Sequence, residues 1–316
     1  NAGNSIASGG NYNTVVGDEA GTAITTGDAN TFVGYTAGDA TTTAESNVAI
    51  GKGSLSTNIL GSKSVAIGAE ALATQNPATA VDMYNVAVGH DAGYAITTGI
   101  QNTFIGGQAG DANTTANNNT GVGKSSLSAT TTGGENTAVG LNALYNNTTA
   151  SNNTAVGVNA LVANTTGAQN TAVGTSAGAA ITTAVNTVVM GYQAGDAITT
   201  GNNNVAIGYA ALSASTTGSS NTAVGKSALG ANTTGHRNSA FGKDSLDANT
   251  TGYYNVAVGE ASLGANTDGH SNTALGHEAL LNNTEGDENV AVGNGALTTN
   301  TTAGSNTAVG TNALRL

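Results

Sequence analysis

One stretch of the sequence carries the residue types of a phosphate-binding loop. Gly123-Lys124-Ser125 has the glycine, lysine and hydroxyl that hold a nucleotide phosphate and its magnesium ion. The loop also needs a glycine five residues before Gly123, and Asn118 stands there. The same triplet returns as Gly225-Lys226-Ser227. A triplet that recurs and lacks its first glycine predicts a structural turn and no nucleotide cofactor.

Acidic side chains are the next candidates for chemistry. Asp28, Asp39, Asp111 and Asp196 follow or flank Ala-Gly turns, where carboxylates could bind calcium. They lack the dense Gly-Asp nonapeptide spacing of calcium-binding β-rolls, so no metal site is predicted. No grouping of serine, histidine and aspartate is unique enough for a catalytic triad, and the paired carboxylates at 287–288 fall on an outer corner. The sequence therefore predicts a protein that is not an enzyme and has no cofactor.

Composition indicates what kind of fold must position these residues. The chain has 316 residues, of which 46 are glycine and 8% are charged, with one proline, no cysteine and no tryptophan. Its hydrophobic residues are mostly alanine and valine, so any core is thin and an elongated shape is favoured over a globule. The net charge of −12, with only seven lysine and arginine residues, argues against nucleic-acid binding and against an anionic membrane surface. No apolar stretch approaches the ~18 residues of a membrane span, so no membrane insertion is expected.

A repeat with a period of seventeen runs through the chain. NTAVG occurs at 153–157 and again at 170–174, and the consensus is N-T-A-V-G-x-x-A-L-x-x-N-T-T-G-x-x. Counted from the asparagine, the fifth-position glycines are Gly17, Gly34, Gly51, Gly68, Gly89, Gly106, Gly123, Gly140, Gly157, Gly174, Gly191, Gly208, Gly225, Gly242, Gly259, Gly276, Gly293 and Gly310. The step between them is constant except from Gly68 to Gly89, so the 18 anchored repeats include one four-residue insertion, near 73–85.

The repeat predicts β-strands rather than helices. We expect an irregular lead-in or partial coil over 1–12 and a continuous parallel β-solenoid over 13–316, with one coil per repeat. The N-T-A-V string is rich in β-branched residues and ends at a glycine, so it is too short for a helix. Successive strand residues point to opposite faces. We therefore expect the fourth-position residue, such as Val156, to fill the coil, and the third-position alanine, such as Ala155, to face a second copy of the chain.

Other positions of the repeat predict how the coil is shaped. Where glycine takes the ninth position in place of leucine, isoleucine often takes the twelfth, which suggests that both positions line one core. Structural turns are predicted at the fifth-position glycines, among them Gly17, Gly34, Gly51, Gly140, Gly157, Gly174, Gly225 and Gly310. First-position asparagines are predicted to form a hydrogen-bonded ladder from coil to coil, among them Asn136, Asn153, Asn170, Asn221 and Asn238.

Exposed rings and hydroxyls are the candidate contacts with other molecules. Tyr35, Tyr192 and Tyr209 share the sixth position and are candidate receptor contacts, because tyrosine can stack on sugars; the alternative is that they cover an apolar rim. His236 and His270 lie two coils apart, about 10 Å, too far to share a metal ion within one chain. Threonine pairs at the thirteenth and fourteenth positions also occur in ice-binding solenoids, so ice binding is an open alternative.

The repeat resembles those of known fibrous proteins. Ser64–Gly68, Asn47–Gly51 and Asn204–Gly208 read SVAIG, NVAIG and NVAIG, and they are similar to the head repeats of YadA-like trimeric autotransporter adhesins. The longer form, NTAVG-x-x-AL followed by NTTG, resembles the repeat arrays of phage tail fibres still more. The resemblance covers nearly the whole chain from Asn13, and it implies a left-handed parallel β-roll assembled as a homotrimer.

These observations lead to a functional hypothesis. We expect an all-β, homotrimeric fibre segment of a phage tail fibre or similar virion appendage, which acts outside the cell as a stiff spacer and contacts a host-surface glycan or protein. An uncapped solenoid end exposes strand edges, so further fibre or tail proteins are expected at the ends. The alternatives are the head domain of a bacterial trimeric adhesin at the cell surface and a self-assembling extracellular filament.

Overall fold

The structure is all-β. The computed structural model describes residues 1–7 and 9–315, which divide into two compact units, Asn1–Val158 and Asn159–Leu316. Each unit is a parallel β-solenoid in which one repeat forms one coil, and no described residue lies in a helix. The ranges 1–12 and 13–316 predicted from the sequence each include one residue outside the described part, at 8 and 316. The solenoid expected from the repeat is present in both units.

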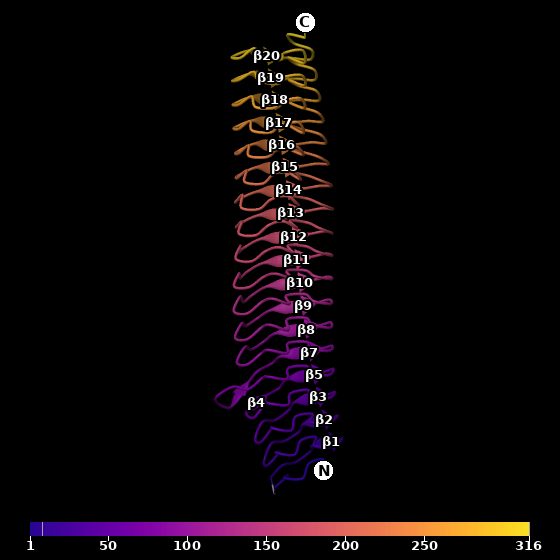
Figure 1. The fold of residues 1–316 in the computed structure, drawn as a ribbon. Helices are drawn as coiled ribbons and strands as arrows, with labels where there is room; N and C mark the ends of the chain where they lie inside the picture. The colour runs from indigo at the N-terminus through magenta and orange to yellow at the C-terminus, as the bar shows by residue number, and fades with distance from the viewer. Residues whose placement is uncertain (8, 316) are drawn as a thin grey trace. The chain divides into compact units, whose positions relative to one another are not determined.

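Short strands mark the coils of the first unit. They are β1 (Thr14–Val16), β2 (Thr31–Val33), β3 (Val48–Ile50), β5 (Val65–Ile67), β7 (Val86–Val88), β8 (Thr103–Ile105), β9 (Thr120–Val122), β10 (Thr137–Val139) and β11 (Thr154–Val156). Within the unit, strands of neighbouring coils pair in parallel, in a register that matches Ala138 with Ala155. Figure 1 shows these strands stacked in one column, from indigo to magenta. Identical positions of the repeat therefore lie next to one another in neighbouring coils.

The second unit has the same arrangement. Its strands are β12 (Thr171–Val173), β13 (Val188–Met190), β14 (Val205–Ile207), β15 (Thr222–Val224), β16 (Ser239–Phe241), β17 (Val256–Val258), β18 (Thr273–Leu275), β19 (Val290–Val292) and β20 (Thr307–Val309). The register again joins equal positions, so Phe241 lies beside Val224 on one side and Val258 on the other. Every consensus letter of the repeat thus becomes a column of side chains along the unit.

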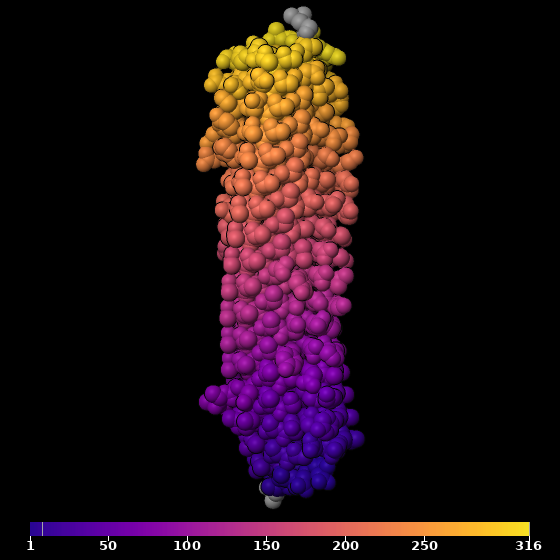
Figure 2. Space-filling model, viewed as in Figure 1, coloured from indigo at the N-terminus to yellow at the C-terminus, as the bar shows by residue number. Residues whose placement is uncertain are grey.

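The four-residue insertion interrupts only one coil of the first unit. β5 pairs with β7 in the usual way, although the matched positions are further apart in the chain than in any other coil. The additional chain allows β4 (Gly61–Ser62) to pair with β6 (Val81–Asp82), and Figure 1 shows β4 to one side of the main column of strands. In Figure 2 purple atoms project from the same flank of this unit. The insertion is therefore accommodated beside the main sheet, whose register continues.

An ion pair closes the insertion coil. Lys63 Nζ lies 2.7 Å from Asp82 Oδ2, and this hydrogen bond raises the pKa of Lys63. The two residues adjoin the β4–β6 pair, since Lys63 follows β4 and Asp82 is the last residue of β6. The ion pair therefore links the ends of β4 and β6 at the surface. A contact in such a place contributes little to stability.

In each strand, the third and fourth repeat positions point in the directions opposite to those expected from the sequence. The third-position alanines are inside the coil, and Ala138 and Ala155 are completely buried. The fourth position points outward, with 37% of Val139 and 36% of Val156 exposed. The expectation that Val156 fills the coil and Ala155 faces a second copy is therefore wrong. The coil is narrow and its ninth- and twelfth-position side chains already occupy the interior, so the third position has room for little more than a methyl group.

Three positions of the repeat share the volume of the core. A Cβ added to Gly195, at the ninth position, would lie 2.6 Å from a methyl group of Val189 and 2.8 Å from Ile198 Cδ1. Glycine at the ninth position therefore makes room for larger residues at the third and twelfth. Phe104 uses the same space in its own coil, where a Cβ on Gly110 would lie 2.4 Å from the ring. The exchange of volume between the ninth and twelfth positions is present, and the third position takes part in it.

The fifth-position glycines turn the chain where neighbouring coils approach most closely. The eight glycines predicted as structural turns all have φ between +127° and +140°, a region that side chains disfavour. A Cβ on Gly225 would lie 2.4 Å from the carbonyl oxygen of Gly242 in the next coil. On Gly310, which has no described coil beyond it, the nearest atom would be Ala313 Cβ at 3.9 Å. Glycine is thus required at this corner both by φ and by the stacking of the coils.

Candidate interaction surface

The outward face of the strands is a column of β-branched and apolar side chains. Threonine or valine usually occupies the second position and valine or isoleucine the fourth, and both point away from the core. In the second unit the largest of these side chains are Met190, Phe241 and Leu275, which are 42% to 48% exposed. Large exposed apolar patches are where proteins commonly associate, so this column is the candidate interaction surface. We call this outward column of second and fourth positions the strand face.

Tyrosines stand just beyond the strand face, after the fifth-position turn. The rings of Tyr192 and Tyr209 are stacked, with centroids 5.6 Å apart and planes at 11°. Both are about half exposed. Tyr35 has the same repeat position and the same exposure but belongs to the first unit. The structure therefore brings two of the three candidate receptor tyrosines together within the second unit, and the third belongs to the first unit.

Further along the second unit, the same column becomes charged. Lys243 Nζ lies 2.9 Å from Glu260 Oε1 and 3.2 Å from Asp244 Oδ2. The hydrogen bonds to Glu260 and then to Asp244 raise the pKa of Lys243, and the hydrogen bond from Lys243 lowers the pKa of Glu260. Lys243 and Glu260 are about half exposed and Asp244 is partly exposed, and ion pairs at such a surface contribute little to stability. This part of the column is a polar surface rather than a binding pocket.

The first-position asparagines lie inside the coils and join each coil to the next. The backbone N–H of Asn153 donates to Oδ1 of Asn136 at 3.0 Å, and that of Asn238 donates to Oδ1 of Asn221 at 3.0 Å. Asn170 accepts in the same way from the backbone N–H of Thr187 at 3.0 Å. Asparagine Nδ2 groups donate to a backbone carbonyl at the fifteenth position of their own coil, as from Asn136 to Ala150. The ladder is therefore structural and does not form a contact surface.

In one coil that lacks the first-position asparagine of this ladder, a side chain at another repeat position makes the missing hydrogen bonds. Ser64 stands where other coils have asparagine, and its hydroxyl is shorter than an amide side chain. Gln75, inside the insertion coil, donates from Nε2 to Ser64 Oγ at 3.1 Å and accepts at Oε1 from Asn85 Nδ2 at 2.9 Å. The glutamine thus supplies the amide that the serine lacks.

A second asparagine ladder was not foreseen from the sequence. It runs through the twelfth position of five successive coils, where the Nδ2 of every member after the first donates to Oδ1 of the preceding asparagine at 2.7 to 3.0 Å. Its members are Asn232, Asn249, Asn266, Asn283 and Asn300. The signal was available, because asparagine takes the twelfth position in each of these coils while leucine takes the ninth. An amide at a core position of consecutive coils indicates a ladder.

The four aspartates considered as calcium ligands are dispersed. Asp28 accepts from the backbone N–H of Asn11 at 2.6 Å, and Asp111 accepts from the hydroxyl of Ser128 at 2.6 Å. Burial raises the pKa of Asp39 and of Asp196 above its usual value. Within 1–7 and 9–315, no three or more histidine, cysteine, aspartate or glutamate side chains gather closely enough to hold a metal ion.

The remaining candidates for chemistry lie on exposed corners. Lys124, of the triplet that resembles a phosphate loop, is exposed where its coil turns. His90 pairs with the adjacent Asp91, with 2.8 Å between Nδ1 and Oδ2. Tyr253 lies between His236 and His270 and stacks on both, so the two histidines are separated by a ring. These side chains are thus surface features of the repeat.

No protein-family model matches the sequence, and no curated protein matches it. The described residues also contain no helix with the length and apolar character needed to cross a membrane. Function is therefore inferred from the repeat and from its surface.

Proposed function

We propose that this protein is a structural and adhesive fibre segment of a phage tail fibre or similar virion appendage, and that it acts outside the cell as a homotrimer. The observation that carries the proposal is the strand face, where apolar side chains such as Met190, Phe241 and Leu275 are exposed in register along the second unit. Covering such a column with that of another copy removes apolar area from water. The resemblance of the NTAVG repeat to tail-fibre arrays supports the number three and the virion setting.

The bonding between coils suits a stiff spacer. Besides the strand pairing and the asparagine ladders, a threonine hydroxyl at the thirteenth position donates to the carbonyl of the same position one coil on. Thr233 bonds Thr250 in this way at 3.0 Å, and Thr250 bonds Thr267 at 3.0 Å. Each coil of a unit is thus tied to the next along several lines at once. Repeated weak contacts along such a spacer would gain strength through multivalency.

The mass of the chain in solution tests the proposed assembly. Sedimentation equilibrium of the full chain is expected to give three times the 30.5 kDa of one chain. The double variant Phe241→Lys with Leu275→Lys places charges on the strand face and is expected to sediment as one chain. The matched control, Thr234→Lys with Thr251→Lys, adds the same charges to the exposed fourteenth position and should remain assembled.

Two results would overturn the proposal. A wild-type chain that stays monomeric at its highest soluble concentration contradicts the homotrimer. A control variant that dissociates as fully as the strand-face variant shows that added charge, and not the strand face, controls assembly. Far-UV circular dichroism of all three samples verifies that the solenoid is intact.

A further inference from the structure

A stack of rings lines one corner of the second unit. At the sixteenth position of successive coils, His236 and Tyr253 have ring centroids 5.2 Å apart and planes at 1°, and Tyr253 and His270 have centroids 4.8 Å apart. Asp287 ends the stack on one side, with its Oδ2 3.3 Å from His270 Nε2. On the other side, Ser219 occupies the place where the next ring would stand. His236 therefore has one face that no ring of the stack covers.

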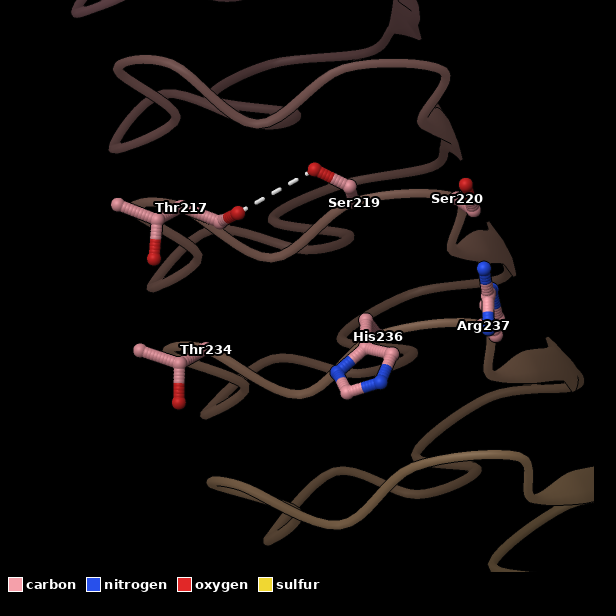
Figure 3. A pocket seen from close by; sticks show the side chains of 6 residues that line it. All are labelled: Thr217, Ser219, Ser220, Thr234, His236 and Arg237. Carbon is pink, nitrogen blue, oxygen red and sulfur yellow. Dashed lines mark hydrogen bonds between the residues drawn. The ribbon is translucent and has the colours of Figure 1, made fainter.

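A shallow depression lies at this open end of the stack. Its volume is about 310 Å³, and it lies between the coil of Ser219 and the coil of His236. Figure 3 shows Thr217 and Thr234 on one side of His236 and Arg237 on the other, with the strands beyond Arg237. The volume is at the lower end of the ~300–1,000 Å³ range of small-ligand pockets, so it suits a single ring. The depression is thus the place of one missing ring in the stack.

Hydroxyl groups of the lining are available to a ligand. Ser219 Oγ is already engaged, because it donates to the carbonyl of Thr217 at 3.3 Å and accepts from the backbone N–H of Asn202 at 3.1 Å. The side chains of Thr217 and Thr234 are exposed, and their hydroxyls form no hydrogen bond within the part of the chain that the structure describes. Two hydroxyls one coil apart can therefore bond to a polyol laid across them.

The depression also has a cation beside it. The Arg237 guanidinium lies 5.2 Å from the centroid of the Tyr254 ring and donates to the Tyr254 hydroxyl, which holds it at the edge of the depression. It pairs with no carboxylate of residues 1–7 or 9–315. In a chain of net charge −12, an arginine without a carboxylate partner favours one anionic group on a ligand.

We infer that this depression binds one pyranose ring of an acidic saccharide, a hexuronic acid residue. The C–H face of the sugar lies on the free face of His236, its hydroxyls bond to Thr217 and Thr234, and its carboxylate pairs with Arg237. The inference deepens the adhesive part of the proposed function and rests on it. The strongly negative chain disfavours a densely charged partner such as nucleic acid, whereas a single carboxylate needs only the one arginine.

A matched pair of sugars tests the assignment on the intact chain. Methyl β-D-glucuronide and methyl β-D-glucoside share a ring and differ in the carboxylate, and binding of each is followed by saturation-transfer NMR and calorimetry. A ligand of this size that makes ordinary contacts is expected to have a Kd on the order of 1 mM. The glucuronide is expected to bind roughly threefold to tenfold more tightly than the glucoside, because an exposed charge pair contributes modestly.

Three variants locate the site. Ser219→Tyr places a ring in the vacant position of the stack and is expected to weaken glucuronide binding at least tenfold. Arg237→Gln is expected to lower the affinity for the glucuronide to that for the glucoside, and to leave the affinity for the glucoside unchanged. Arg315→Gln removes the other arginine of the chain and should change the affinity for neither sugar. Circular dichroism and sedimentation of each variant verify that it is folded and assembled as the wild type is.

The outcomes separate this inference from the proposed assembly. A Ser219→Tyr variant that binds glucuronide as wild type does overturns the site, and a wild-type chain that binds the glucoside as tightly as the glucuronide overturns the acidic ligand class. A trimeric chain that binds neither sugar contradicts the inference and leaves the spacer role standing. A monomeric chain that binds glucuronide with the expected variant effects supports the site and contradicts the homotrimer.

Discussion

Asn113 in the first unit and Asn249 in the second occupy the same twelfth position, and both are completely buried. Asn249 donates to Oδ1 of Asn232 at 2.8 Å and accepts from Nδ2 of Asn266 at 2.8 Å. Neither Oδ1 nor Nδ2 of Asn113 has a hydrogen-bond partner among residues 1–7 and 9–315. One residue type at one repeat position therefore stabilises the coil in one place and carries a desolvation cost in the other.

The neighbouring coils explain the difference. The coils on either side of Asn113 have Ile96 and Thr130 at the twelfth position, and neither offers an amide. The coils around Asn249 carry asparagine there on both sides. Because each amide donates to one neighbour and accepts from the other, a ladder needs consecutive copies. Asparagines in consecutive coils thus hydrogen-bond to one another, whereas a single asparagine at the same repeat position has no such partner.

Breaking the complete ladder is expected to have the largest effect. Asn249→Leu leaves Asn232 Oδ1 without its donor and Asn266 Nδ2 without one of its acceptors, inside the coil. The expected loss is about 3 kcal/mol in the free energy of unfolding, since each buried unsatisfied group costs ~1–3 kcal/mol. Urea denaturation measures it, and hydrogen exchange should show lost protection in coils 221–300. The exposed Thr251→Leu is the control; if the two variants are equally stable, the ladder contributes nothing.

The same substitution at the isolated asparagine is expected to have the opposite sign. Asn113→Leu removes two buried polar atoms that have no partner among the described residues and replaces them with two methyl groups in the same branched arrangement. A gain of about 1–2 kcal/mol in the free energy of unfolding is expected. The same urea titration measures it. A loss as large as that of Asn249→Leu would mean that isolated and stacked amides do not differ.

Extending the ladder to Asn113 sharpens the comparison further. Asn147 Nδ2 at present donates to Thr130 Oγ1 at 3.3 Å, and Thr130→Asn would place an amide between Asn147 and Asn113. The new side chain can donate to Asn113 Oδ1 and accept from Asn147, so stability should rise by about 1 kcal/mol. Thr130→Val, which has no amide, is the matched control. Equal midpoints for the two variants would contradict the need for consecutive copies.

Asp39 provides the smallest test, through pH. Its Oδ1 is buried and has no hydrogen-bond partner in the part of the chain that the structure describes. Burial is the main reason that the pKa of Asp39 is raised above the usual 3.8, while its backbone hydrogen bonds oppose the rise. The folded chain then holds the proton more tightly than the unfolded chain, so wild-type stability falls as pH rises through the folded pKa. Asp39→Asn removes this fall and should be more stable than wild type by less than about 1 kcal/mol at pH 7, with the advantage lost below pH 3.8. Urea midpoints at pH 3 and pH 7 measure the difference, and an advantage that grows toward low pH would contradict the sign.

Much of the fold follows from the sequence. The constant period and the β-branched N-T-A-V string predict parallel strands in successive coils, and strands such as Thr137–Val139 begin at the second repeat position. The exchange of volume between Gly195 and Ile198 was also readable, because the two residues are close in the chain and change together. The orientation of Ala155 and Val156 was not, since both are apolar and alternation says only that they face opposite ways.

The sequence predicted the candidate surfaces only in part. A shared repeat position was enough to place Tyr192 beside Tyr209, because the register of the coils is the period of the sequence. The depression beside His236 depends instead on the fourteenth, sixteenth and seventeenth positions of two coils, whose side chains converge only when the turn between them has its actual path. No spacing in the chain encodes that convergence.

By itself, the sequence determined which residues lie next to which along each unit, because a constant period brings equal positions into register. Only the tertiary structure decided which side of each column faces water. That choice depends on the width of the coil, which the third-, ninth- and twelfth-position side chains set together when they pack to constant density. The alanines went inside because no larger side chain fits there in most coils, and the valines were left on the outward face.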